Sequence, residues 1–297
     1  MNLSNANQNY NNPDTKAIIA ISGPRGFLGS TLLRTTFAGY SVSALTADIR
    51  DASAVLTEIK ECKPQWIIHT AAKTSIAECE SNPDNARAVN AEGTKNITDA
   101  ARAVGARLIY ISTVSVFSGH EGNYKEDSTP EPIINVYNIT KRDGELSVLA
   151  YEKGMVLRIN LIGAHPDGSR GKNFLEWIVD SARANKDIAL FNDQFINPLS
   201  NWTVAELIKM IIEKDIQEKI LHIGSSDILS KAVIGKLVLA RFTDYRGIVT
   251  EKSIDSIADG IPRPKQMWLN TERATTLLGP MPTVAQELGA LFQKPPF

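Results

Sequence analysis

Short apolar runs alternate with amphipathic stretches through the first half of the chain. The apolar runs, each of the length of a buried strand, are 16–22, 40–46, 65–72, 106–113 and 155–163. Apolar residues at helical spacing occupy the intervening stretches 27–39, 51–63, 83–105 and 136–154. Strands that alternate with helices predict right-handed crossovers and a parallel sheet covered on both faces. The pattern therefore predicts an α/β fold with a doubly wound, Rossmann-type sheet.

The alternation becomes irregular after about residue 163. Amphipathic helices are expected in 173–186, 202–215, 229–242 and 270–279, with short β-like segments between them. We expect residues 16–163 to form a dinucleotide-binding domain. Residues 164–297 are expected to form mainly a substrate-binding lobe and to return one strand, at about 217–223, to the sheet. The Asn-rich residues 1–15 are interpreted as a disordered tail, since they lack the basic start and apolar core of a secretory signal.

Composition and charge argue against several classes of protein. The chain of 297 residues is 43% hydrophobic and 22% charged, with a formal net charge of -1, as is typical of soluble globular proteins. Neither nucleic acid nor a membrane is therefore expected as a partner. Cys62 and Cys79 have no metal-site spacing, so neither a disulfide framework nor a metal site is expected. A reducing, cytoplasmic location fits this pattern.

Three glycines follow the first predicted strand. Gly23, Gly26 and Gly29 lie in SGPRGFLGS, between that strand and a predicted helix. In a doubly wound sheet, glycines at this turn let the backbone approach a pyrophosphate near the start of the helix. The triplet alone is a weak signal, and a tight turn with close helix packing is the structural alternative. Its Gly-x-x-Gly-x-x-Gly spacing is the form seen in short-chain dehydrogenase/reductases.

The 2′ group of the cofactor is expected to be recognised near the end of the second strand. An acidic residue there would hold a ribose hydroxyl, whereas an arginine would accommodate a 2′-phosphate. Arg25 lies in the glycine loop and the strand ends in Thr46, which favours NADPH over NADH. Asp48 lies close enough to the strand end to keep NADH open as the alternative.

A tyrosine and a lysine in VYNITK form the candidate catalytic pair. Tyr137 and Lys141 are four residues apart, which places both on one face of a helix. An ammonium nearby, together with the positively charged nicotinamide of an oxidised cofactor, is expected to bring the phenol pKa of Tyr137 closer to neutral, so that Tyr137 protonates a carbonyl oxygen. Thr113 ends the preceding strand and is expected to share the substrate oxygen. The alternative for Thr113 is a hydroxyl that caps a turn.

Taken together, these segments resemble an extended short-chain dehydrogenase/reductase, and more closely the dTDP-4-dehydrorhamnose reductase family. The similarity runs from about residue 17 nearly to the end. The matching segments are GPRGFLG, ADIRD, IIHTAAKT, AVNAEGTKN, ISTVSVFSG, VYNITKRDGE, LRINLIG, NFL, NDQFINP and RPKQMWLN.

The resemblance implies roles for individual residues. Thr113, Tyr137 and Lys141 match the catalytic triad, with the Tyr-Lys pair also holding the nicotinamide ribose. The implied pyrophosphate loop and its neighbours are Gly23, Arg25, Gly26, Phe27, Leu28 and Gly29. Further implied cofactor contacts are the adenine-contacting pair Asp48 and Ile49, then Ala71, Ala72 and Lys73 after the third strand, and Asn90 beneath the nicotinamide side. Positions implied to lie near a nucleotide sugar are Phe117, Asn173 and Gln194.

The sequence also departs from the family pattern. Val114 and Ser115 follow the catalytic Thr where Asp-Tyr is usual, and Asn138 follows the catalytic Tyr where Gly is common. Related dehydratases carry an acidic pair after that Thr, so dehydration is not expected here. These changes leave the exact sugar open.

Three functions stay open from the sequence. The first is NADPH-dependent reduction of the C4 keto group of a nucleotide-linked 4-keto-6-deoxy sugar, and the second is epimerisation of a nucleotide sugar. The third is a non-catalytic, dinucleotide-binding regulatory subunit, because such relatives of the reductases exist and fold alone does not imply activity. The helix in 202–212 is interpreted as an ordinary amphipathic helix, although related proteins often pair through such helices, so a homodimer stays open.

Overall fold

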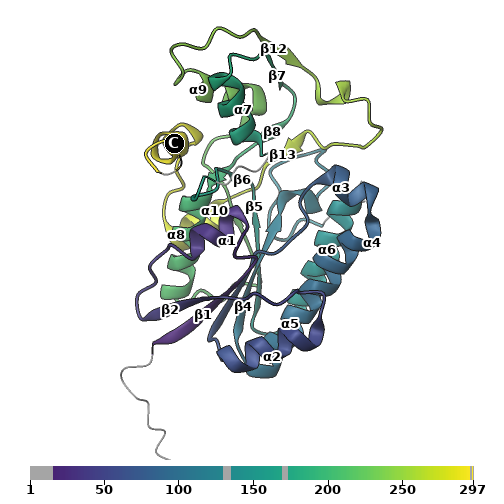
Figure 1. Ribbon diagram of the computed structural model, residues 1–297, viewed down its shortest axis with the longest axis vertical. Helices are drawn as coiled ribbons and strands as arrows, with labels where there is room; N and C mark the ends of the chain where they lie inside the picture. Colours follow the sequence, from purple (N-terminus) through teal and green to yellow (C-terminus); the bar gives the residue numbers. More distant parts are fainter. Residues whose placement is uncertain (1–15, 130–134, 169–172, 295, 297) are drawn as a thin grey trace, which may run out of the picture.

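The computed structural model describes residues 16–129, 135–168, 173–294 and 296. Figure 1 shows a sheet with helices on both faces, and a smaller lobe beyond one end of its strands. The predicted tail, 1–15, lies outside the described residues. The doubly wound α/β fold expected from the sequence is confirmed.

Six parallel strands form the main sheet, in the order β10-β5-β4-β3-β1-β2. They are β1 (Ala17–Ser22), β2 (Tyr40–Ala44), β3 (Trp66–His69), β4 (Arg107–Thr113), β5 (Gly154–Ile159) and β10 (Ile220–Ile223). From β1 the chain first adds β2 on one side and then β3 on the other. The topological switch point, where doubly wound sheets bind ligands, therefore lies between the carboxyl ends of β1 and β3.

The two faces of the sheet are covered by different helices (Figure 1). One face packs against α1 (Phe27–Leu32), α8 (Asn201–Glu213) and α10 (Glu272–Leu278). The other packs against α2 (Ala52–Cys62), α5 (Thr94–Val104) and α6 (Val136–Leu149). The apolar face of α8 is buried in this core, which agrees with its interpretation as an ordinary amphipathic helix.

The smaller lobe holds a separate apolar core built on three helices. They are α7 (Phe174–Arg183), α9 (Lys231–Leu239) and α11 (Val284–Leu291). Short strands complete the lobe and its junction with the sheet: β6 (Leu161–Ile162), β7 (Ile188–Phe191), β8 (Phe195–Ile196), β9 (Leu199–Ser200), β11 (Leu229–Ser230), β12 (Val249–Lys252) and β13 (Gln266–Met267). Three-residue 3-10 turns are η2 (Val114–Val116) and η3 (Ile254–Ser256).

Several predicted elements have different bounds in the structure. The helix expected over 27–39 ends at Leu32, and turns lead from there to β2. The single helix expected over 83–105 consists of α4 (Pro83–Arg87), the π-helical η1 (Ala88–Gly93) and α5, while α3 (Ile76–Ser81) was not predicted. Apolar periodicity does not reveal a short π-helical segment. Its hydrogen bonds span five residues instead of four, a change too small to alter the spacing of apolar residues over one or two turns.

Among the described residues, no helix combines the length and apolar character needed to cross a membrane. The same part of the chain contains no group of three or more His, Cys, Asp or Glu side chains placed to hold a metal ion.

Candidate active site

The glycine loop forms a close-packed turn at the switch point. Gly23 has φ +70°, a left-handed conformation that favours glycine. A Cβ atom on Gly23 would lie 2.7 Å from the Ala71 backbone nitrogen, and one on Gly29 would lie 2.1 Å from the Gly23 carbonyl oxygen. Both positions therefore exclude any larger side chain. This crowded backbone without side chains fits the approach of a dinucleotide pyrophosphate.

The charged residues beside the loop differ in how they are engaged. Arg25 is exposed in the loop. Asp48 forms an exposed ion pair with Arg50 at 2.5 Å, and hydrogen bonds from Arg50 lower the pKa of Asp48 to about 2. The carboxylate of Asp48 is thus already paired with a guanidinium group. Ile49 is 8% exposed and packs into the core, so its side chain offers little surface to an adenine ring.

Asn90 holds the segment that follows β3. Its Oδ1 accepts from the Lys73 backbone N–H at 2.8 Å, and its Nδ2 donates to the Lys73 carbonyl at 3.0 Å and to Thr140 Oγ1 at 3.1 Å. Asn90 is fully buried, whereas Lys73 is exposed and Ala71 and Ala72 are half-buried. The structure therefore places Asn90 as a support for the Ala71–Lys73 segment. This buried position is compatible with the place beneath the nicotinamide side that the resemblance implies.

Thr113 and Tyr137 meet at the end of β4. The Thr113 side chain lies close enough to the Tyr137 phenol to lower its pKa, and the Thr113 hydroxyl accepts from the Ser115 backbone N–H at 3.1 Å. Thr113 therefore caps the η2 turn and faces the tyrosine at the same time. Asn135 Oδ1 accepts from the Asn138 backbone N–H at 3.0 Å and so fixes the start of α6 just before Tyr137.

Without a bound nicotinamide, the pKa of Tyr137 is raised and not lowered. Burial raises the pKa of Tyr137 to about 12, against a smaller lowering by the Thr113 side chain. Burial also lowers the pKa of Lys141 to about 7, so this amine carries only a partial charge near neutral pH. Desolvation dominates both groups because they are deeply buried.

Lys141 packs against the sheet beside Tyr137. Its Nζ donates to the Ile111 carbonyl at 2.8 Å and lies 4.1 Å from the centroid of the Tyr110 ring. Tyr110 in turn stacks with His69 of β3 at a ring separation of 5.4 Å. We call Thr113, Tyr137 and Lys141 the α6 site.

A row of polar side chains crosses the sheet beneath the α6 site. Register pairs Ser22 with His69, and Ser112 with Arg158 and then His222, all on the face that α6 covers. The opposite face is apolar at these strand ends. This row was not predicted, but Arg158 is a single charge within the apolar run 155–163, and that was the available signal. We call these five residues the polar row.

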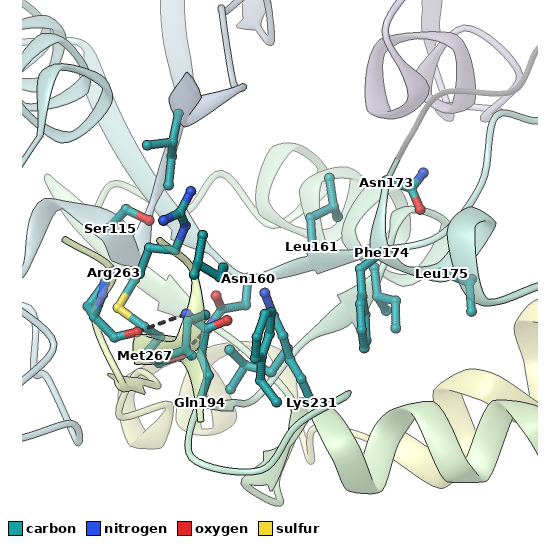
Figure 2. Close-up of a pocket in the computed structure, with 17 residues that line it drawn as sticks. Ser115, Asn160, Leu161, Asn173, Phe174, Leu175, Gln194, Lys231, Arg263 and Met267 are labelled. Atoms are coloured by element: carbon teal, nitrogen blue, oxygen red, sulfur yellow. Dashed lines mark hydrogen bonds between the residues drawn. The ribbon is translucent and has the colours of Figure 1, made fainter. Parts of the chain in front are cut away.

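A cavity of about 320 Å³ opens between the end of β4 and the smaller lobe (Figure 2). Asn173 and Gln194, both predicted near the substrate, line it together with Ser115. Thr113 and Tyr137 are not among its lining residues. Phe117 is not either: it is 1% exposed and stacks on Tyr124 at a ring separation of 4.2 Å. The structure therefore places Phe117 in the core, contrary to the role implied by the resemblance.

Two cations and an unpaired acceptor were missed by the sequence analysis of this cavity. Figure 2 shows Lys231 and Gln194 between Arg263 on one side and Asn173 on the other. Gln194 Nε2 donates to the Pro264 carbonyl at 2.8 Å, while its buried Oε1 has no hydrogen-bond partner in the described chain. Burial and the neighbouring Arg263 lower the pKa of Lys231 to about 8. We call this cavity the lobe pocket.

Asn173 has a local role in the same cavity. Its Oδ1 accepts from the Glu176 backbone N–H at 3.0 Å and its Nδ2 donates to the Glu176 carboxylate at 2.5 Å. It therefore caps α7 while lining the pocket.

Asn138, at the position where the family commonly has glycine, is fully buried. Neither of its amide side-chain atoms finds a hydrogen-bond partner among the residues described. An unpaired buried amide is costly, by about 1–3 kcal/mol per group.

The chain matches the family described as RmlD substrate binding domain over residues 17–294. A dTDP-4-dehydrorhamnose reductase from Streptomyces griseus is 32% identical over 224 residues, which are 72% of this chain and 67% of that protein. The methionine adenosyltransferase 2 subunit beta of Xenopus tropicalis is 40% identical over 116 residues, 39% of this chain and 34% of that protein.

Among solved structures, the fold is similar to a crystal structure of dTDP-4-dehydrorhamnose reductase from Bacillus anthracis in complex with NADP. That similarity has a TM-score of 0.86 and 27% identity, and it covers 94% of this chain and 99% of the other.

Proposed function

Because the chain belongs to the RmlD substrate binding domain family, we propose that it reduces the C4 keto group of a nucleotide-linked 4-keto-6-deoxy sugar with NADPH. It is an NAD(P)-dependent oxidoreductase of the extended short-chain dehydrogenase/reductase type. The observation that carries the proposal is that Tyr137 and Thr113 lie next to each other, at the same sheet edge as the glycine loop.

NADPH, when bound, supplies the hydride. Gly23, Gly26 and Gly29 would hold its pyrophosphate, since they form the first strand-to-helix turn at the switch point. Gly23 and Gly29 keep that turn close-packed, because a Cβ atom there would meet the backbone of Ala71 or of Gly23. Arg25 is exposed beside the loop and Asp48 is already paired with Arg50, so a 2′-phosphate has an available cation and the ribose hydroxyl lacks a free acid. This arrangement supports NADPH over NADH.

Tyr137 is the proposed proton donor. Its raised pKa keeps the phenol protonated at neutral pH, as a donor to the developing alkoxide must be. As C4 gains hydride, the carbonyl oxygen takes the phenolic proton and the ketone becomes an alcohol, which leaves a tyrosinate. Thr113 would position the same oxygen, and Lys141 would stabilise the tyrosinate until a proton returns from solvent.

The lobe pocket is the proposed site of the nucleotide diphosphate. Lys231 and Arg263 offer positive charge, and a diphosphate would restore the charged form of the desolvated Lys231 amine. The buried Oε1 of Gln194 needs a donor, which a sugar hydroxyl or a base N–H would supply. Ser115, two residues after Thr113, lines the pocket on the side of β4.

The alternatives are less well supported. Val114, where dehydratases carry an acid, is 2% exposed and apolar, so dehydration has no base at that position. The match to the methionine adenosyltransferase subunit extends over only 39% of this chain, whereas the match to the Streptomyces griseus reductase extends over 72%. A cytoplasmic location, supported by two free cysteines, and a homodimer are part of the proposal.

The test is oxidation of NADPH, followed by absorbance, with a panel of nucleotide sugars. We expect turnover with a dTDP-linked 4-keto-6-deoxy sugar, weaker turnover with its UDP- and GDP-linked counterparts, and lower kcat/KM with NADH. Product analysis must show a new C4 hydroxyl. NADPH binding without oxidation by any of these sugars would contradict reduction and favour a regulatory role.

A further inference from the structure

Lys141 is a buried cation without a contacting counter-ion. It is 3% exposed, and its Nζ contacts a carbonyl oxygen and an aromatic ring, with no carboxylate within ion-pair distance in the described ranges. A lysine in such surroundings tends to lose its proton. A mechanism that needs its ammonium therefore requires negative charge from somewhere nearby.

Several titratable side chains lie around Lys141, on β3, β4, α3 and α6. Besides Glu145 they are Tyr110 of β4, His69 of β3, Tyr137 of its own helix and, next to Tyr137, Cys79 of α3. Burial raises the pKa of Tyr110, Tyr137 and Cys79 and lowers that of His69 to about 3. All four are therefore neutral at pH 7. In this part of the chain, Glu145 raises the pKa of Lys141 against the larger lowering by burial, and Arg142 and Arg158 are bonded to the Glu145 carboxylate.

Glu145 lies one helical turn beyond Lys141 on α6 and is fully buried. Its Oε1 accepts from Ser112 Oγ at 2.6 Å and from Arg158 Nε at 2.8 Å. Its Oε2 accepts from Arg158 Nη2 at 2.8 Å and from Arg142 Nη1 at 3.0 Å. The carboxylate thereby joins α6 to β4 at the residue before Thr113, and to β5.

Arg158 is held on its far side as well. Its Nη1 donates to His222 Nε2 at 3.2 Å, and His222 Nδ1 donates to the Tyr124 carbonyl at 2.9 Å. The guanidinium is 1% exposed and so cannot move to water. Ser112 and Arg158 are register partners on adjacent strands, and the order of the strands places Arg158 farther than Glu145 from the β3–β4 surface under Lys141.

We propose that Glu145 is a positioning residue for the reaction: its buried carboxylate fixes α6 against β4 and β5 and favours the ammonium form of Lys141 against the opposing effect of burial. The effect of Glu145 on catalysis rests on the proposed function. Its effect on the charge of Lys141 is a property of the ligand-free protein and does not. At the short distances along one helix face, a buried charge acts through a medium far less polarisable than water.

The test measures titration of Lys141 directly, by NMR of the protein labelled at lysine Cε, with Lys141→Arg to assign the resonance. In Glu145→Gln, which removes the charge and retains an amide oxygen, we expect the midpoint of Lys141 to fall by about one pH unit or more. Glu145→Asp keeps the charge, so Lys141 should titrate nearly as in the parent. Glu58→Gln is the control, because Glu58 lies on α2 and its carboxylate accepts from Thr46 and the Ala47 backbone N–H.

Kinetics provide the second readout. The alkaline limb of kcat/KM for NADPH-dependent reduction should move to lower pH in Glu145→Gln, whereas Glu145→Asp should lower kcat without moving that limb. If Glu145→Gln fails to fold because Arg158 is left unpaired, the double variant Glu145→Gln/Arg158→Met removes both buried charges and takes its place.

An unchanged Lys141 midpoint in a folded Glu145→Gln or double variant would overturn the charge effect. A kcat for Glu145→Asp equal to that of the parent would overturn positioning. If no sugar is reduced by the parent protein, the proposed function fails, while the NMR titration still decides the role of Glu145.

Discussion

The α6 site and the lobe pocket differ in what satisfies their polar groups. In the α6 site, the Thr113 and Lys141 side chains are bonded to the backbone and Tyr137 lies next to Thr113, and the polar row beneath them is bonded across the sheet. In the lobe pocket, Gln194 Oε1 lacks a partner in the described chain and Lys231 is desolvated beside another cation.

This difference separates chemistry from recognition. Groups that must stand at a fixed distance from a reacting atom are held by protein bonds that exist before any ligand arrives. Groups that select a ligand are left to be completed by it. Asn138 and Asn135 are exceptions at the start of α6, since among the described residues both amide atoms of Asn138 and the Nδ2 of Asn135 are buried without a partner.

The largest effect is expected from removing the phenolic oxygen at the α6 site. Tyr137→Phe should lower kcat by about 10²–10⁴-fold, the usual contribution of a positioned acid or base. Because the ring remains, NADPH affinity measured by fluorescence titration should stay within about twofold of the parent, a change worth only a few tenths of a kcal/mol. Residual activity near the parent level would show that another group delivers the proton.

A side chain added to the glycine loop is expected to weaken the binding of NADPH, whereas Tyr137→Phe lowers kcat. In Gly29→Ala the new Cβ would lie 2.1 Å from the Gly23 carbonyl, so the loop must shift. Overpacking of about 1–3 kcal/mol corresponds to roughly a 10–100-fold weaker Kd for NADPH. Gly289→Ala is the control, because its Cβ would have only Arg241 at 3.8 Å. Equal NADPH affinity in both variants would argue against a pyrophosphate at this turn.

Loss of Lys231 should affect the sugar nucleotide and leave the cofactor alone. Lys231→Met should raise the KM of the nucleotide sugar by about 10–100-fold, as expected for a charge-assisted hydrogen bond of about 1.5–3 kcal/mol. Lys294→Met is matched, since both amines lie 5.5 Å from an aromatic centroid, but Lys294 is on Trp202 and does not line the pocket. An equal rise in KM in both variants would contradict a role of Lys231 in binding the nucleotide sugar.

Acid is expected to destabilise the folded protein by protonating the two histidines of the polar row. The pKa values of His69 and His222 are lowered to about 3, below the unfolded value near 6.5, so the folded protein binds fewer protons than the unfolded one between those pH values. Stability is therefore complete above about pH 6.5 and falls toward pH 3, by up to about 1.4 kcal/mol per pH unit for each histidine.

Urea unfolding at a series of pH values measures this slope. His222→Gln should remove the contribution of one histidine to the change of the free energy of unfolding with pH. The fold is expected to be kept, because the amide can still donate to Tyr124 and accept from Arg158. The exposed His120→Gln should change nothing. A slope unaffected by His222→Gln would place the acid sensitivity elsewhere.

The smallest effect concerns Asn138. Asn138→Leu, which keeps the shape and removes the unpaired amide, should leave the free energy of unfolding unchanged or raise it by about 1 kcal/mol. Asn197→Leu is the contrast, because its amide bonds the backbone of Ser225 and Leu269, and its loss should be destabilising by about 1–3 kcal/mol. Thermal unfolding of the ligand-free variants decides between them. A destabilised Asn138→Leu would mean that the amide has a partner.

Sequence reasoning reached the α6 site because its residues follow from local order. Glycines after the first strand, a threonine at the end of the fourth and a Tyr-Lys pair at helical spacing all stand next to elements that their own periodicity predicts. The lobe pocket was reached only in part, since Lys231 and Arg263 are ordinary surface-type residues until folding brings them beside Gln194.

The sequence by itself determined the order of strands and helices, the glycine turn and the helix face that carries Tyr137 and Lys141, because these depend on neighbours within one or two turns. Only the tertiary structure decided the protonation of those two groups, the burial of Phe117 and the bonding of Glu145 to Arg158. Desolvation and long-range register set these, and neither can be read from residues that are close along the chain.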